Sequence, residues 1–366
     1  MDLDWSRYYL RDIPFVELPT VNPTSSDLRI NGRIFSREGF EAQYQGLLGL
    51  IQREKGLCYV RAESDVLGTG KSALLAAVYW DLKDDKKKRD RYTPVWADVE
   101  TPGSISQLLG RVLDAMVTEN VIDSIKSELK DLTPSSISSL LSKRIRQPSP
   151  SAVLAVSRIL QMPTDELSTK YVNIRRSISM VSAVEVFQYI LTAYGRTEEK
   201  RRVVVFINQF EEYVRTQRGI AGLRRLGEDM NDLIRSVQNC GNITFVLTLY
   251  PSSEAMLQTV GPIIETFGTI RANSVTTGEL DTPSFLAIAK AYLDKFRTEN
   301  APRGIGPLHP FDEDVVTFFA NECNGIPRNF IRYLHNALVE AALAGHGTVT
   351  LDFVKSPEIL PKMDIK

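Results

Sequence analysis

Residues 57–80 read LCYVRAESDVLGTGKSALLAAVYW, and this stretch decides the expected fold. The apolar run from Leu57 to Val60 is long enough for a buried strand. A loop containing Gly68 and Gly70 follows, and Lys71 with the next serine then opens a segment of strong helix formers. A strand, a glycine loop, a Lys-Ser pair and a helix in this order are the parts of a phosphate-binding loop, or P-loop.

Each part of the P-loop has a physical role in binding a polyphosphate. Gly68 and Gly70 let the backbone bend, so that successive N–H groups, including that of Thr69, point toward a phosphate. The helix that follows adds its positive N-terminal end. Lys71 is expected to reach the terminal phosphates, and the Ser72 hydroxyl to take one ligand position on Mg²⁺. The expected cofactors are therefore ATP and Mg²⁺.

The P-loop departs from the usual pattern at its first position, where Asp65 stands in place of glycine. Aspartate tolerates left-handed backbone angles better than most residues, so we expect the turn to form around it. Its negative charge is unfavourable near a triphosphate. The alternative interpretation is an ordinary strand–turn–helix in which Gly70, Lys71 and Ser72 coincide by chance.

Composition limits the class of protein. The chain has 366 residues, 43% of them hydrophobic and 24% charged, and a net charge of −1. These values indicate a globular protein of two or three domains with no overall charge favouring nucleic acid or membrane. We find no apolar stretch long enough to span a bilayer and no signal-peptide pattern, so a cytoplasmic protein without a membrane partner is expected. The three cysteines are far apart, which fits a reducing compartment.

The fold expected from the pattern is α/β: a three-layer P-loop NTPase with a parallel sheet, a helical insertion and a C-terminal all-helical lid. Apolar runs predict strands at 57–60, 92–99, 203–207, 243–250 and 269–275, separated by helices. Helical periodicity covers 40–51, 105–129, 181–194, 283–297, 311–323 and 327–344. We place a proline-rich arm laid over the surface at 1–30, the ATPase core at 31–280, the insertion at about 131–180 and the lid at 281–366.

A P-loop protein needs a second, acidic element at the tip of a neighbouring strand. The strand at 203–207 ends in Asn208-Gln209-Phe210-Glu211-Glu212. We expect Glu211 to orient or deprotonate the attacking water. Asn208 stands where an aspartate would support the metal, and its uncharged amide predicts weaker metal binding and slow turnover. The alternative is that these acids only begin a solvent-facing helix.

Two further positions complete the expected ATP site. Thr248 or Tyr250, at the end of the next strand, would face the γ-phosphate and hydrogen-bond the attacking water. Arg328 follows Gly325 and Pro327 at the start of a helix, where an arginine on a lid can answer the γ-phosphate charge. A surface arginine at a helix start is the alternative.

These elements in this order resemble the AAA+ ATPases and the related STAND ATPases over residues 30–354. Residues 34–38 (IFSRE) are similar to the GRE motif that precedes the first helix, and 68–72 match Walker A. Residues 203–212 resemble a Walker B of the DQFEE kind, Thr248 falls at sensor 1, and 325–328 look like the GxPR sensor 2 of origin-recognition-type initiators. The resemblance implies an ATP site between an α/β domain and a small helical lid.

One part of the AAA+ pattern is missing. Rings of these ATPases usually carry an arginine finger just before the fifth strand, and residues 264–268 (IETFG) contain no arginine. Arg271 is a poor substitute because it lies in the expected strand. A homo-oligomer is possible, but the sequence does not indicate which residue would supply the arginine finger.

The segment 131–180 is more basic than the rest of the chain. Lys143, Arg144 and Arg146 end a candidate helix and are suited to phosphate contacts with DNA. The alternative is a helical insertion with a solvated basic face. The full helix-turn-helix pattern is absent.

The sequence therefore predicts an ATP-dependent switch of AAA+/STAND type. Two classes of role stay open: a DNA-associated ATPase, as in replication, transposition or mobile-element defence, and a protein-interaction switch that does not touch DNA. A third reading is a pseudo-ATPase that binds ATP with little hydrolysis, because Asp65 and Asn208 both depart from the usual pattern.

Overall fold

The structure of the protein is a computed structural model. It describes residues 3–17, 21–34, 37, 39–53, 56–98, 105–119, 121–129, 190, 194, 201–217, parts of 219–231, 242–258 and 272–363. The described chain divides into two compact units. Unit 1 comprises residues 1–46, 62–77 and 276–366, and unit 2 comprises 47–61 and 78–275.

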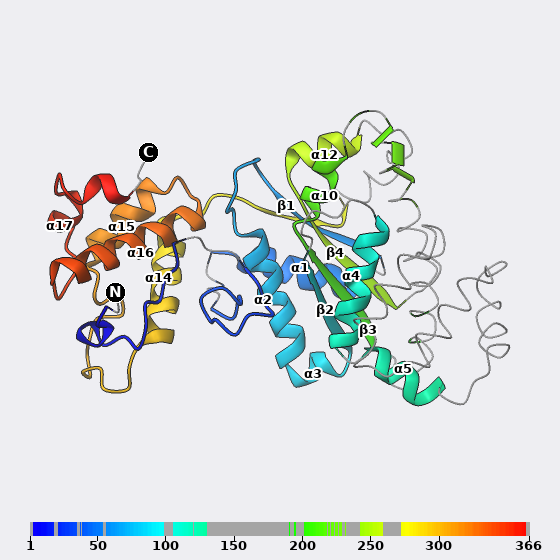
Figure 1. Ribbon diagram of the computed structural model, residues 1–366, viewed down its shortest axis with the longest axis horizontal. Helices are drawn as coiled ribbons and strands as arrows, with labels where there is room; N and C mark the ends of the chain where they lie inside the picture. The colour runs from blue at the N-terminus through cyan, green and yellow to red at the C-terminus, as the bar shows by residue number, and fades with distance from the viewer. Residues whose placement is uncertain are drawn as a thin grey trace. The chain divides into compact units, whose positions relative to one another are not determined.

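A parallel sheet with the strand order β2-β3-β4-β1-β5 forms the α/β part of the chain (Figure 1). Its strands are β1 (Leu57–Ala62), β2 (Tyr92–Asp98), β3 (Arg202–Asn208), β4 (Ile243–Leu249) and β5 (Ser274–Thr277). The direction of β5 follows from two hydrogen bonds, Tyr59 N–H to Asn273 O at 2.8 Å and Glu63 N–H to Thr277 O at 3.0 Å, because both partners rise together along the chain. The predicted parallel α/β sheet is confirmed.

Helices lie on both faces of this sheet in unit 2. Trp96 and Phe206 are register partners on β2 and β3, and Tyr79 packs on both with ring centroids 5.9 and 6.0 Å away. Thr93 is an odd number of residues from Trp96, so it points to the opposite face. There its hydroxyl lies 2.8 Å from the hydroxyl of Tyr194, another helical residue. The expected three-layer arrangement is therefore present.

The helices of the described chain have the following bounds. They are η1 (Trp5–Tyr8), α1 (Glu41–Arg53), α2 (Lys71–Asp84), α3 (Lys86–Arg89), α4 (Ile105–Thr118), α5 (Val121–Leu129), α10 (Phe210–Thr216), α12 (Pro251–Gln258), α14 (Thr282–Phe296), α15 (Glu313–Glu322), α16 (Pro327–Ala344), α17 (Leu351–Lys355) and η3 (Leu360–Met363).

Two predicted elements need correction. The single helix expected over 105–129 is two helices, α4 and α5. The side chain of Glu119, between them, accepts hydrogen bonds from Lys83 and Tyr79 at 2.8 Å. The strand expected at 269–275 begins only at Ser274.

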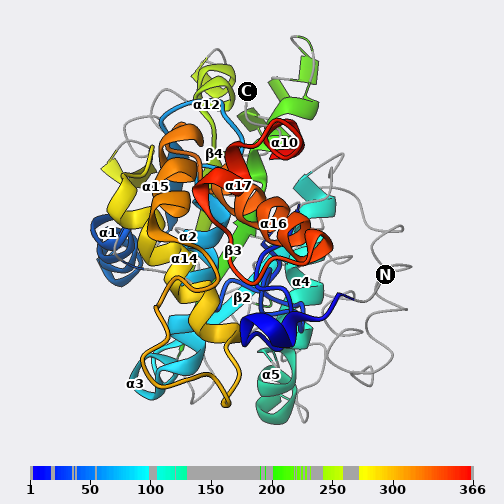
Figure 2. The ribbon, with the colours of Figure 1, turned by 90° about the vertical axis from the view of Figure 1, so that its left-hand side faces the viewer.

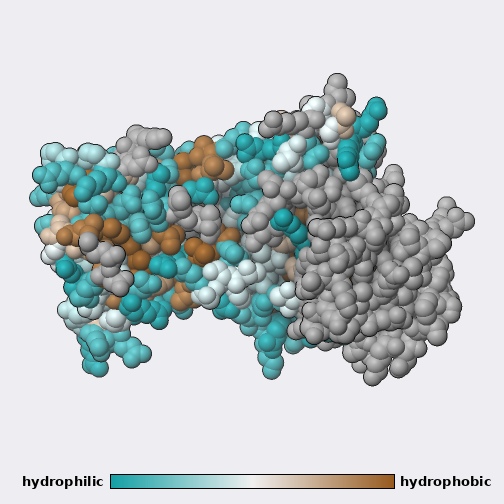
Figure 3. All heavy atoms as spheres, in the orientation of Figure 1, coloured by the Kyte–Doolittle hydropathy of each residue, from teal (hydrophilic) through white to brown (hydrophobic). Residues whose placement is uncertain are grey.

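The C-terminal helices and the N-terminal segment form one hydrophobic core in unit 1 (Figure 2). The sequence predicted an arm over the surface, but Tyr8, Leu10 and Phe15 are at most 1% exposed. The Tyr8 hydroxyl donates to His346 O at 2.7 Å, which fixes the segment to the end of α16. Burial of two aromatic rings explains why this segment joins the core. In Figure 3, hydrophobic residues (brown) lie among hydrophilic ones on the left-hand part of the molecule, where these helices lie.

Candidate functional site

The predicted P-loop connects β1 to α2. Gly68 and Gly70 have φ values of 95° and 91°, which only glycine adopts without strain. Asp65 is not among the described non-glycine residues with positive φ, so the turn does not use it in the left-handed conformation that we expected. The loop therefore bends at its last two glycines, and Asp65 lies exposed in the segment before them.

The last residues of the P-loop are largely buried, whereas its first residues are exposed. Thr69 and Lys71 are 6% and 4% exposed, and Ser72 is half-buried at the start of α2. The Thr69 hydroxyl lies 3.5 Å from the hydroxyl of Thr277 on β5. Sequence reasoning did not identify Thr277, and no local pattern marks it.

Arg328 lies beside the P-loop in unit 1. A Cβ atom added to Gly68 would come within 2.5 Å of the Arg328 Cβ and 3.2 Å of its Cδ, so the stem of the arginine covers this glycine. A Cβ on Gly70 would meet the Phe40 ring at 2.6 Å. The structure therefore brings Arg328 to the P-loop, and it adds Phe40, which the sequence placed only at the start of a helix.

Gly325 sets the place of Arg328. Its φ is 71°, its carbonyl accepts from Leu280 N–H at 3.0 Å, and a Cβ there would lie 2.4 Å from the Cβ of Glu279. Only glycine fits this conformation and this close approach. Pro327 then begins α16, so that Arg328 occupies the first turn of the helix.

The predicted acidic element lies at the junction of β3 and α10 in unit 2. Asn208 ends the strand and Glu211 lies in the first turn of the helix, and both side chains are only 4% exposed. Gln209 between them has a φ of 61°, a left-handed conformation that is unfavourable for a side chain with a Cβ. The buried position of Glu211 argues against a purely solvent-facing helix start.

Thr248 on β4 contacts this acidic element directly. Its hydroxyl donates a short hydrogen bond to Glu211 Oε2 and accepts one from Phe210 N–H at 3.1 Å. Thr248 is fully buried. The sequence predicted that this residue faces the γ-phosphate and the attacking water, and that role stays a prediction; in the structure its hydroxyl bonds the carboxylate of Glu211. Tyr250, the alternative, is also buried.

The strands that carry these residues end at one edge of the sheet. Val60 on β1 is the register partner of Thr248 on β4, and Leu247 is the partner of Ile207 on β3. All three strands run parallel, so their carboxyl ends share one edge. At this edge Arg61 donates from Nε to Glu254 Oε2 on α12 at 2.8 Å, an ion pair that the sequence did not indicate.

Several predicted residues fall outside the described part of the chain. These are Lys143, Arg144 and Arg146 in the basic segment, residues 35, 36 and 38 of the GRE-like motif, the segment 264–268 and Arg271. Within the described part, no group of three or more His, Cys, Asp or Glu side chains could hold a metal ion. The helices described include none that is long and apolar enough to cross a membrane.

A cavity of about 510 Å³ lies along α14 in unit 1. Its walls are Pro283, Leu286, Ala287, Lys290, Ala291, Asp294, Pro307, Leu308 and Glu313. None of the predicted site residues lines it. The cavity is therefore separate from the P-loop and Arg328.

Comparison with known proteins gives a likeness of fold only. No family model and no curated protein matches the sequence. The ADP form of the Aeropyrum pernix ORC2 protein superposes with a TM-score of 0.53 at 12% identity, covering 88% of this chain and 67% of the other. Its ADPNP–ADP complexes give 0.53 at 11% identity, covering 98% and 71%.

The chain therefore shares the fold of these ORC2 structures. The likeness extends over most of both chains, and it agrees with the parallel sheet and the glycine loop after β1. In this chain, Gly68 and Arg328 share one unit, whereas Asn208, Glu211 and Thr248 belong to the other.

Proposed function

We propose that this protein binds Mg-ATP through residues 68–72 and works as a nucleotide-dependent switch. The close approach of the Arg328 stem to Gly68 supports this proposal, because the guanidinium of this side chain could then reach a phosphate bound at residues 68–72. An arginine recognises phosphate oxygens through a planar fork of donors. ATP and ADP differ in charge at the γ position, so such a cation can distinguish them.

The chemistry of the P-loop fits a polyphosphate. Gly68 and Gly70 have positive φ values, and such a backbone can turn successive N–H groups toward a phosphate. Lys71 is 4% exposed and begins α2, so a cation and a helix N-terminus meet at one place.

Ser72 and Asn208 are the residues that we propose to hold Mg²⁺. The metal, when bound, would neutralise charge on the phosphates and on the leaving group. A hydroxyl and an amide are oxygen ligands of the type that Mg²⁺ accepts, but neither carries a charge. We therefore propose that metal binding is weaker, and turnover slower, than an aspartate at position 208 would allow.

Glu211 is the residue that we propose to orient or deprotonate the attacking water. Its support is the shared edge at which β1, β3 and β4 end, since the P-loop continues directly from β1. Thr248 is a positioning residue in this scheme, because its hydroxyl holds one carboxylate oxygen of Glu211. The second carboxylate oxygen would act on water.

The switch would use the region 281–366 as a lid. Arg328 would favour a closed lid while the γ-phosphate is present, and loss of that charge on hydrolysis would weaken the closed state. A second candidate function is ATP binding with little hydrolysis. The uncharged amide of Asn208 favours this second function. A measurement of ATP turnover distinguishes it from the hydrolysing switch.

Nucleotide affinity of two variants tests the site. Lys71→Ala should abolish measurable ATP binding, and Arg328→Ala should reduce the preference for ATP over ADP. Arg303→Ala removes an exposed arginine of the same unit and should change neither property. Unchanged ATP affinity in folded Lys71→Ala would refute the nucleotide site.

A further inference from the structure

Cations gather at the amino edge of the sheet, where the parallel strands begin. Arg202 at the start of β3 donates from Nη1 to the carbonyl of Ile51 at 2.7 Å, near the end of α1. Its backbone N–H donates to Arg91 O at 2.9 Å. These two bonds hold Arg91 and Arg202 close to the helix end that carries Arg53.

The short helix α3 adds further cations at this edge. It reads Lys86-Lys87-Lys88-Arg89 and contacts β2. Lys88 forms a short ion pair with Asp81, whereas the side chains of Lys86, Lys87 and Arg89 are exposed. Asp85 is used at the N-cap, where it accepts from Lys87 N–H at 2.9 Å. The helix therefore presents three exposed cations.

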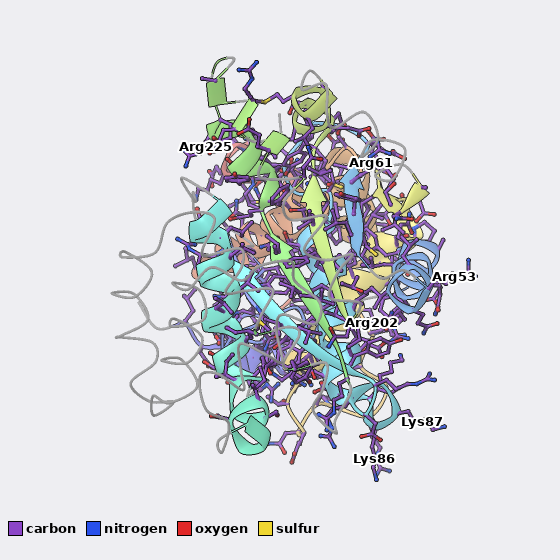
Figure 4. The ribbon with its side chains drawn as sticks, turned by 90° about the vertical axis from the view of Figure 1, so that its right-hand side faces the viewer. Arg53, Arg61, Lys86, Lys87, Arg202 and Arg225 are labelled. Carbon is purple, nitrogen blue, oxygen red and sulfur yellow. The ribbon has the colours of Figure 1, made fainter. Side chains whose placement is uncertain are left out.

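Charge at this edge is unlike that of the whole chain. The described residues at this edge include eight cations and four carboxylates, whereas the net charge of the whole chain is −1. The cations are Arg53, Lys86, Lys87, Lys88, Arg89, Arg91, Arg201 and Arg202, and the carboxylates are Asp81, Asp84, Asp85 and Asp90. In Figure 4, Lys86 and Lys87 lie at the lower right, Arg202 lies above them and Arg53 lies at the right edge, whereas Arg61 and Arg225 lie nearer the top.

We propose that this amino-edge surface, formed by Arg53, Lys86, Lys87, Arg89, Arg91 and Arg202, binds the phosphate backbone of duplex nucleic acid. All six residues belong to unit 2. Phosphates at regular spacing along a duplex match a row of lysine and arginine side chains on a rigid sheet edge. The surface is separate from Lys143, Arg144 and Arg146, and its proposal does not depend on ATP binding.

Two other polyanions fit this surface less well. Membrane docking needs apolar side chains beside the cations. The exposed large apolar residues of the described chain are Val66, Leu67, Leu343 and Leu360, all in unit 1. Single-stranded nucleic acid needs exposed aromatic rings for stacking. Tyr92 is the aromatic residue next to α3 and Arg91, and it is buried.

The test measures the salt dependence of duplex DNA binding by the full chain. The variant Lys86→Glu/Lys87→Glu/Arg89→Glu should weaken binding at every sequence tested. The slope of log K against log salt is negative, and each lost phosphate contact reduces its magnitude by about 0.9, so the magnitude should fall by about 2 to 3. ATP turnover of the variant should equal that of the wild type.

A control variant changes the net charge equally at another place. Lys290→Glu/Lys295→Glu/Arg303→Glu reverses three exposed cations of unit 1 and should leave the slope unchanged. If the first variant does not fold, Lys86→Gln/Lys87→Gln/Arg89→Gln removes the cations without adding acids and should give a smaller fall in the same direction.

Four results would overturn the proposal. They are no measurable DNA binding by the wild type, an unchanged slope in the α3 variant, an equal fall in the control variant, and a fall only on reversal of Lys143, Arg144 and Arg146. If the α3 variant lost binding to phosphatidylserine vesicles but kept its DNA binding, the surface would be assigned to membranes instead. None of these results depends on whether ATP is hydrolysed.

Discussion

The hydroxyl of Thr248 donates a hydrogen bond to the carboxylate of Glu211, between the end of β4 and the first turn of α10. Both side chains are buried, and the same hydroxyl accepts from Phe210 N–H at 3.1 Å. One threonine therefore fixes both the backbone and the side chain of the acidic element. Bonds to a charged group contribute about 1.5–3 kcal/mol, enough to hold one orientation of the carboxylate.

Thr248→Val tests this relationship. Valine has a similar volume but no hydroxyl, so Phe210 N–H and one oxygen of Glu211 lose their partner. We expect ATP affinity to be retained, turnover to fall by about tenfold or more, and stability to fall by about 1–3 kcal/mol. Thr248→Ser keeps the hydroxyl and should restore most of the turnover. Full turnover in Thr248→Val would contradict a positioning role.

Glu211→Gln tests the proposed role of the carboxylate in turnover. An amide cannot accept a proton, so ATP should still bind while hydrolysis falls by roughly 10²–10⁴-fold. Glu212→Gln is the matched control, because Glu212 is partly exposed and pairs with Arg215 at 3.0 Å. Equal effects of the two substitutions on ATPase rate would remove Glu211 from the reaction.

Asn208→Asp tests the missing charge of the metal site. A carboxylate strengthens interactions with a cation by about 1.5 kcal/mol or more, which is about tenfold in affinity. The Mg²⁺ concentration for half-maximal turnover should therefore decrease by about tenfold, and the maximal rate should rise. Asn300→Asp, at an exposed turn, should leave the Mg²⁺ dependence as it is. A Mg²⁺ titration of ATPase activity decides between these outcomes.

Gly325→Ala tests how Arg328 is placed. The added Cβ would approach the Cβ of Glu279 to 2.4 Å in a left-handed backbone conformation. We expect a stability loss of about 1–2 kcal/mol or more and a smaller preference for ATP over ADP. Gly347→Ala has open space around its Cβ and should change neither. Wild-type discrimination between nucleotides in Gly325→Ala would argue against the proposed arginine contact.

Gln209→Gly tests the strained residue between Asn208 and Glu211. Glycine adopts a φ of 61° without the cost of about 1–2 kcal/mol that a Cβ adds. Since glycine also loses more entropy on folding, we expect a net gain of up to about 1 kcal/mol. Thermal unfolding measures it, and Gln209→Ala should show no gain. A lower unfolding temperature for Gln209→Gly would show that its side chain contributes more than the strain costs.

Local chemistry allowed much of the fold and the site to be predicted from the sequence. The apolar runs of β1, β3 and β4, the glycine loop and the Gly-Ile-Pro-Arg helix start are local patterns, and each depends on neighbouring residues along the chain. The ion pair between Glu119 and Lys83 was missed because the two residues are distant in sequence. The buried position of Tyr8 was missed for the same reason.

The sequence by itself determined which residues carry the candidate chemistry: Gly68, Lys71, Ser72, Glu211 and Arg328. Only the tertiary structure decided which of them meet. Arg328 lies against Gly68, and Thr248 donates a hydrogen bond to Glu211. The cations of α3 lie beside Arg91 and Arg202. The reason is physical: glycine torsions and helix starts follow from adjacent residues, whereas strand order and register bring distant side chains together.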